Sequence, residues 1–162
     1  MGSNSRRIFN RSGIGENGEI GFIINKIAKQ IIDCFVRGNK VLIFGNGGSL
    51  ADASHFAAEF HGLGPVIALN DLAKITSIAN DGDFDYIFAQ QVYDLGKKGD
   101  IIVGLSSSGN SKNVNIALFL AEDLGFEIID FPRLGANTQE VQNFQYQLLH
   151  DIYLKVKKLT SA

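Results

Sequence analysis

A histidine and a glutamate stand four residues apart in the stretch FGNGGSLADASHFAAEF, residues 44–60. On a helix, His55 and Glu59 would lie about 40° apart and share one face, where they could hold a metal ion or move a proton. Near the C-terminus, Gln142 and His150 are separated by about 80° around a helix, so they too could converge on one point. An isolated pair or a lone histidine is more often structural, and that alternative stays open for all of these residues.

A loop of serines suggests a different chemistry. The sequence SSSGNS, residues 106–111, follows an apolar run and opens a helical pattern. Serine hydroxyls and the free N–H groups of a helix N-terminus both donate hydrogen bonds to anions. A solvated turn is the alternative, but the position after a strand favours a phosphate cradle. A nucleoside triphosphate is not expected, because the G-x-x-x-x-G-K-[ST] pattern is missing. The hydroxyls of this cradle belong to Ser106, Ser107, Ser108 and Ser111.

The loop GNGGS, residues 45–49, is a second candidate binding loop. Its glycines allow a ligand to approach the backbone, and Asn46 and Ser49 could bond sugar hydroxyls. A dinucleotide is not expected, because the G-x-G-x-x-G spacing and a following acidic residue are missing. Ser49 is also well placed to cap the next helix.

The stretch NDGDFD, residues 80–85, superficially matches a calcium loop. Counted from Asp81, the sixth position is Tyr86 and the twelfth is Val92, where such a loop needs glycine and glutamate. We therefore expect these residues to cap a helix, with Asp81 reaching toward the site.

The elements that must position these residues follow from hydrophobic periodicity. The pattern predicts strands at 41–44, 66–69, 101–105 and 126–129, and helices at 19–36, 49–60, 72–79, 84–95, 112–124 and 138–159. Alternating strands and helices imply a parallel α/β sandwich. Ligands bind such sheets at the carboxyl ends of the strands, and both polar loops fall there.

Composition limits the class of protein. The chain has 162 residues, 45% of them apolar and 20% charged, with a net charge of −2. We expect one domain at 19–162 after a disordered tail at 1–18, and no nucleic-acid or membrane partner. The tail has no apolar region typical of a secretory signal, no apolar run approaches the ~20 residues of a membrane span, and Cys34 is the single cysteine. A cytoplasmic protein is therefore expected.

Taken together, these stretches resemble the SIS (sugar isomerase) domain family, and within it the phosphoheptose isomerases. The resemblance covers about residues 20–156 and rests on GNGGSLADASHFAAEF, IALNDLAKITSIAND, IFAQQV, KGDIIVGLSSSGNSKNV and, less specifically, TQEVQNFQYQLLHDIY. It implies a three-layer sandwich with a flavodoxin-like parallel sheet and long N- and C-terminal helices. It also implies a homotetramer with its site between subunits.

The resemblance further implies an aldose–ketose isomerase that converts sedoheptulose 7-phosphate to D-glycero-manno-heptose 7-phosphate through an enediol, for bacterial surface glycans. Glu59 would be the base and His150 the acid. Zinc would be held by His55, Glu59, Gln142 and His150. The implied substrate contacts are Asn46, Gly47, Gly48, Ser49, Glu59, Asn80, Asp81, Ser106, Ser107, Ser108, Ser111 and Gln142.

The match to the family departs in three places. The last helix has EVQN and Gln145 where the family has R-I-Q-E and a following histidine, so a register on Gln139 and Gln147 is an alternative to Gln142 and His150. The connections after His61 and Ile129 are shorter than in the family. They are either deletions or segments absent from the sequence, and we favour absent segments, because a parallel crossover needs about a dozen residues.

Two other functions stay open. A non-catalytic SIS protein, such as the family's replication-initiator-associating members, would lack the last-helix histidine, so His150 favours the enzyme. An isomerase of another sugar phosphate is the second alternative.

Overall fold

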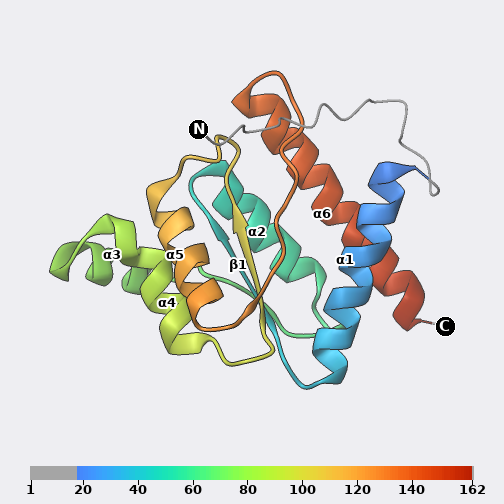
Figure 1. Ribbon diagram of the computed structural model, residues 1–162, viewed down its shortest axis with the longest axis horizontal. Coiled ribbons are helices and arrows are strands. Elements are labelled where there is room, and N and C mark those ends of the chain that lie inside the picture. Colours follow the sequence, from blue (N-terminus) through green and yellow to red (C-terminus); the bar gives the residue numbers. More distant parts are fainter. Residues whose placement is uncertain (1–17, 162) are drawn as a thin grey trace.

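The structure, a computed structural model, describes residues 18–161, so the tail expected at 1–18 lies outside the described residues except for Gly18. Strands and helices alternate along the chain (Figure 1). The strands are β1 (Val41–Gly45), β2 (Val66–Ala68), β3 (Ile101–Leu105) and β4 (Glu127–Ile128). The helices are α1 (Glu19–Val36), α2 (Gly48–Glu59), α3 (Leu72–Asp81), the 3₁₀ turn η2 (Phe84–Tyr86), α4 (Ile87–Leu95), α5 (Lys112–Asp123) and α6 (Thr138–Thr160).

The described strands form one parallel sheet in the order β2-β1-β3-β4. This confirms the predicted flavodoxin-like arrangement. Side chains alternate across β1: Val41 and Ile43 pack with α1, α2 and α6, whereas Leu42 and Phe44 pack with α4 and α5. Both faces are thus covered, which explains why the strands read as continuous apolar runs.

Helix α6 lies along α1, and its N-terminal half lies beside α2 (Figure 1). Its start is fixed by Asn137, whose side chain accepts a hydrogen bond of 3.0 Å from the backbone N–H of Glu140. The Glu140 carboxylate in turn accepts one of 3.0 Å from the N–H of Ala136. This reciprocal capping sets the position from which α6 presents its polar side chains.

Two local expectations differ from the structure. Helix α2 has Gly47, with φ of 54°, as its N-cap, so Ser49 does not cap it and lies buried inside the helix. Glycine fits there because a positive φ is disfavoured for other residues. The helix predicted at 84–95 is divided into η2 and α4.

The connection between β4 and α6, residues 129–137, forms no fifth strand in the described structure. Ile129 and Phe131 are buried and complete the core between the sheet and α6. The expectation that segments are absent from the sequence after Ile129 stays a prediction.

No helix among residues 18–161 is long and apolar enough to cross a membrane.

Candidate active site

The strongest polar convergence joins α2 and α6. His150 Nδ1 lies 2.7 Å from Glu59 Oε1, and His55 Nε2 lies 3.6 Å from the same oxygen. A carboxylate only accepts hydrogen bonds, so His150 donates through Nδ1–H. The Glu59 side chain is 13% exposed, and its Oε2 is buried without a hydrogen-bond partner. The structure therefore brings three of the predicted residues together and leaves one carboxylate oxygen free for a ligand.

Gln142 contacts the same helix near its N-terminus, at Gly48. A Cβ atom on Gly48 would overlap Gln142 Nε2 and lie 2.7 Å from its Cδ, so the amide is seated directly on this glycine. Burial raises the pKa of Asp52, while a hydrogen bond from Gln142 and the charge of His55 oppose that rise. Gln142 and His150 thus both face α2.

The alternative register does not place its residues there. The Gln139 side chain donates to Asn143 at 3.1 Å and that of Gln147 to Asp151 at 3.0 Å, both on the exposed side of α6.

The serine loop folds back on itself between β3 and α5. The Ser106 hydroxyl accepts a hydrogen bond of 3.0 Å from the N–H of Gly109 and lies 3.1 Å from the Ser111 hydroxyl. Ser108 accepts one of 3.1 Å from the N–H of Asn110. Ser111 is the N-cap of α5 but makes no capping hydrogen bond. Its hydroxyl and the first turn of α5 are therefore able to serve an anion.

Two side-chain amides join the serine loop to the glycine loop. Asn46 Nδ2 donates to Asn113 Oδ1 at 2.8 Å, and Asn113 Nδ2 donates to Asn46 Oδ1 at 2.9 Å. Asn113 Oδ1 also accepts from the N–H of Val114 at 2.9 Å. The amide that was expected to bond a sugar is thus engaged in fixing the two loops relative to each other.

Asn80 and Asp81 lie away from the contact between α2 and α6. Both side chains are exposed at the end of α3. Within the described residues, Asn80 Nδ2 donates a hydrogen bond of 2.9 Å to Asp81 Oδ1. Figure 1 shows α3 and α6 on opposite sides of the molecule. One subunit therefore does not bring them to Glu59, and their substrate contacts stay a prediction.

Three polar residues near the site were missed by the sequence reasoning. Asn113 is buried where α5 begins, and Gln145 is 2% exposed with both amide atoms unpartnered. Arg133, in the connection to α6, packs against Gly109 of the serine loop. A signal existed for Gln145, a polar residue on the apolar face of α6, but none existed for Arg133.

The residue types fit zinc, which binds imidazole and carboxylate groups. The buried, unpartnered Oε2 of Glu59 is the atom that a cation would satisfy. As they lie, however, no group of three or more His, Cys, Asp or Glu in the described part of the chain is arranged to hold a metal ion. The direct contact between His150 and Glu59 explains this, because each occupies a ligand position of the other.

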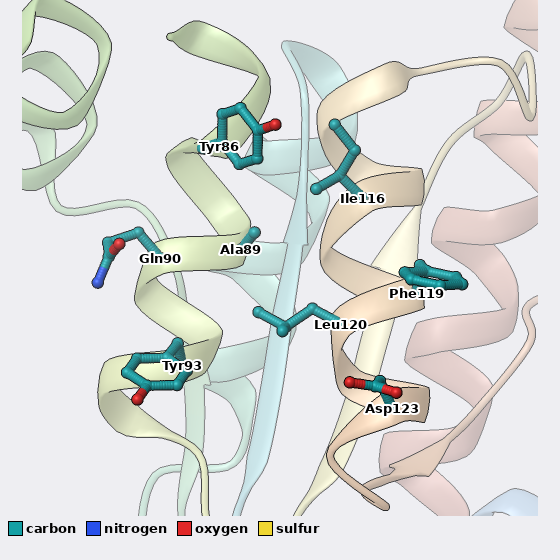
Figure 2. Close-up of a pocket in the computed structure, with 8 residues that line it drawn as sticks. All are labelled: Tyr86, Ala89, Gln90, Tyr93, Ile116, Phe119, Leu120 and Asp123. Carbon is teal, nitrogen blue, oxygen red and sulfur yellow. The ribbon is translucent and has the colours of Figure 1, made fainter. Parts of the chain in front are cut away.

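A groove of about 460 Å³ between α4 and α5 contains none of the predicted site residues. Its walls are mainly apolar and aromatic, with Tyr86 and Ala89 on one side and Ile116 and Leu120 across from them (Figure 2). Its lining residues include no acid–base pair like that of Glu59 and His150, so the α2–α6 contact is the stronger candidate site.

Comparisons with known proteins show the family and the fold. The sequence profile of the SIS domain family matches residues 22–131. The chain is 49% identical over 118 residues to the phosphoheptose isomerase of Thermodesulfovibrio yellowstonii, over 67% of this chain and 58% of that protein. It is 46% identical over 121 residues to the phosphoheptose isomerase of Desulfovibrio desulfuricans, over 70% of this chain and again 58% of the relative. The matched stretch thus spans less than two thirds of each relative's length.

Solved structures show the same fold. The phosphoheptose isomerase GmhA from Neisseria gonorrhoeae superposes with a TM-score of 0.79 at 31% identity, covering 85% of this chain and 87% of that chain. The phosphoheptose isomerase from Francisella tularensis superposes with a TM-score of 0.79 at 28% identity, covering 86% and 87%.

The four-stranded parallel sheet with helices on both faces defines an α/β sandwich of the class shared with these solved structures. This chain belongs to the SIS domain family.

Proposed function

We propose that this protein is a phosphoheptose isomerase, which converts sedoheptulose 7-phosphate to D-glycero-manno-heptose 7-phosphate. The observation that carries the proposal is the 2.7 Å contact between His150 Nδ1 and Glu59 Oε1, which unites a base and an acid from two helices. The relatives named phosphoheptose isomerase, at 49% and 46% identity, support the choice of substrate. The product would supply bacterial surface glycans.

The chemistry is a proton transfer between C1 and C2. Glu59 takes the proton from C1 while His150 protonates the carbonyl oxygen on C2, which gives an enediol. His150 then takes the proton from the C1 hydroxyl as Glu59 returns its proton to C2, which leaves an aldehyde at C1. Each group starts and ends in the same protonation state, so the cycle closes without a redox cofactor.

The two loops would hold the substrate during this transfer. The phosphate would sit at Ser106, Ser107, Ser108 and Ser111, and the sugar at Gly47, Gly48, Ser49 and Gln142. Phosphate at the N-terminus of α5 is favoured by its free N–H groups and the helix dipole. The reactive end of the sugar would then extend toward α2 and Glu59.

We also propose one zinc ion per subunit, with His55, Glu59, Gln142 and His150 as ligands. The buried and unpartnered Oε2 of Glu59 supports this assignment. When bound, zinc would stabilise negative charge on the substrate oxygen as a Lewis acid. In this structure Glu59 and His150 contact each other directly, so zinc binding requires their side chains to rearrange.

A homotetramer with its site between subunits is proposed as the working assembly, in the cytoplasm where sugar phosphates are made. Apolar side chains exposed on α1 and α6 support an assembly, since Phe22 is 69% and Leu154 47% exposed. A second subunit could also supply the Asn80 and Asp81 contacts that one chain does not make. Light scattering of the purified protein tests this state directly.

Incubation with sedoheptulose 7-phosphate, followed by detection of the aldose product, tests the activity. Turnover is expected, and it should increase when zinc is supplied to metal-free protein. Absence of turnover with and without zinc, while a control isomerase works in the same assay, would favour a non-catalytic SIS protein. Turnover of fructose 6-phosphate in preference to the heptulose would identify an isomerase of another sugar phosphate.

A further inference from the structure

Arg133 lies directly against the serine loop, although it comes from the connection between β4 and α6. A Cβ atom placed on Gly109 would be 3.2 Å from Arg133 Nε and 3.5 Å from its Cδ and Cζ. Gly109 has a φ of 73° and donates its N–H to Ser106, so it forms the turn of the loop. The guanidinium group is therefore held beside the hydroxyls that are proposed to bind phosphate.

The charge of Arg133 is available to a ligand. The ion pair that Arg133 makes among residues 18–161 is to Asp130, with 3.9 Å between Nη1 and Oδ1, and its side chain is 45% exposed. An exposed ion pair at this distance contributes little to the stability of the protein, so it holds the guanidinium group only weakly. The nearby Lys112, the first residue of α5, is instead engaged in an ion pair with Asp85 of η2.

A phosphate ester needs such a charge. Phosphate monoesters carry about −1.5 to −2 at neutral pH, whereas the serine hydroxyls are neutral donors. Arginine matches phosphate geometry because its planar fork donates two parallel hydrogen bonds. Arg133 thus has the position, the weakly paired charge and the planar guanidinium group that phosphate binding requires.

We propose that Arg133 is a further substrate-binding residue, whose guanidinium group binds the phosphate together with the hydroxyls of the serine loop. This inference rests on the proposed phosphate site. Because residues 129–137 lead directly into α6, Arg133 also connects the phosphate to the helix that carries Gln142 and His150. A bound phosphate would thereby hold the start of α6 close to α5.

The test measures binding of inorganic phosphate to the intact protein by calorimetry, for the wild type, Arg133→Ala and Arg133→Lys. Arg37→Ala is the matched control, because Arg37 is 49% exposed, has a similarly long contact to Glu127 of 3.4 Å, and follows α1, remote from the serine loop. Arg133→Ala should weaken phosphate binding roughly tenfold, since one charge-assisted contact is lost. Arg133→Lys should lie between it and the wild type, because lysine keeps the charge without the fork.

Phosphate affinity of Arg133→Ala within twofold of both wild type and Arg37→Ala would overturn the proposal. So would a wild type that does not bind phosphate. Circular dichroism establishes that the variants are folded, and the exposed position of Arg133 favours this. If Arg133→Ala binds phosphate about tenfold more weakly than wild type, but sedoheptulose 7-phosphate is not isomerised, the role of Arg133 stands and the proposed reaction fails. With active enzyme, Arg133→Ala should raise KM for the sugar phosphate much more than it lowers kcat.

Discussion

The imidazole of His150 and the carboxylate of Glu59 are 2.7 Å apart, although 91 positions separate them in the chain. The contact exists because α6 packs beside α2, with Leu148, Leu149 and Phe56 in the core below it. An acid–base function of this pair would depend on that packing as much as on the two residues. Four predictions test the arrangement.

Removal of either member of the pair should greatly slow isomerisation without unfolding the protein. We expect Glu59→Gln and His150→Ala each to lower kcat by about 10²–10⁴, the usual contribution of a positioned general acid or base. His61→Ala is the matched control, because His61 is exposed just beyond α2 and should retain wild-type activity. Steady-state kinetics decide the question, and near-normal kcat in His150→Ala would remove the acid from the proposed mechanism.

The amide pair of Asn46 and Asn113 should show strong energetic coupling. Replacing Asn113 by alanine leaves the buried N–H of Val114 and the amide of Asn46 without partners, which should cost about 1–3 kcal/mol of unfolding free energy. The double variant Asn46→Ala/Asn113→Ala should cost less than the sum of the single changes, by about 1 kcal/mol. Urea unfolding of the four proteins measures this cycle, and strictly additive losses would show that the pair is not coupled.

Gly48→Ala should displace Gln142, because the new methyl group would overlap the Gln142 amide. We expect a loss of zinc affinity and activity, read by metal titration and kinetics. The control is the same change in a Gln142→Ala background, where the overlap is absent. There alanine should leave the free energy of unfolding nearly unchanged, because the overlap is absent and Gly48 is only the first residue of α2. Equal effects in the two backgrounds would contradict the predicted clash.

Cys34 should resist thiol reagents while the protein is folded. It is fully buried, burial raises the pKa of its thiol, and its Sγ is 3.4 Å from the carbonyl oxygen of Lys40. A raised pKa lowers the fraction of reactive thiolate at any given pH, and burial blocks access as well. Labelling at pH 8 should therefore be slow in buffer and fast in guanidinium chloride. Rapid labelling of the native protein would show that the end of α1 opens readily.

The layout of the fold was accessible from the sequence. Continuous apolar runs such as 101–105 and amphipathic patterns such as 19–36 predict their elements, because each depends on local periodicity and on burial of one or both faces. The predicted helix boundary that was wrong depends on a single residue. Gly47, with its positive φ, starts α2 in place of Ser49 as the cap.

The site was predicted only in part. His55 and Glu59 share a helix, so their spacing alone indicates a common face. Gln142 and His150 came from the resemblance, and their spacing did not exclude the register on Gln139. Packing of α6 on α2 turns Gln142 and His150 inward and leaves Gln139 on the surface.

The sequence by itself determined the parallel α/β architecture, the two polar loops and the family, since these follow from periodicity and from contiguous residues. Only the tertiary structure decided that Asn46 is paired with Asn113 and that Arg133 lies on the serine loop. Such contacts join segments far apart in the chain. Their geometry depends on how the layers pack, and no local pattern of residues encodes that geometry.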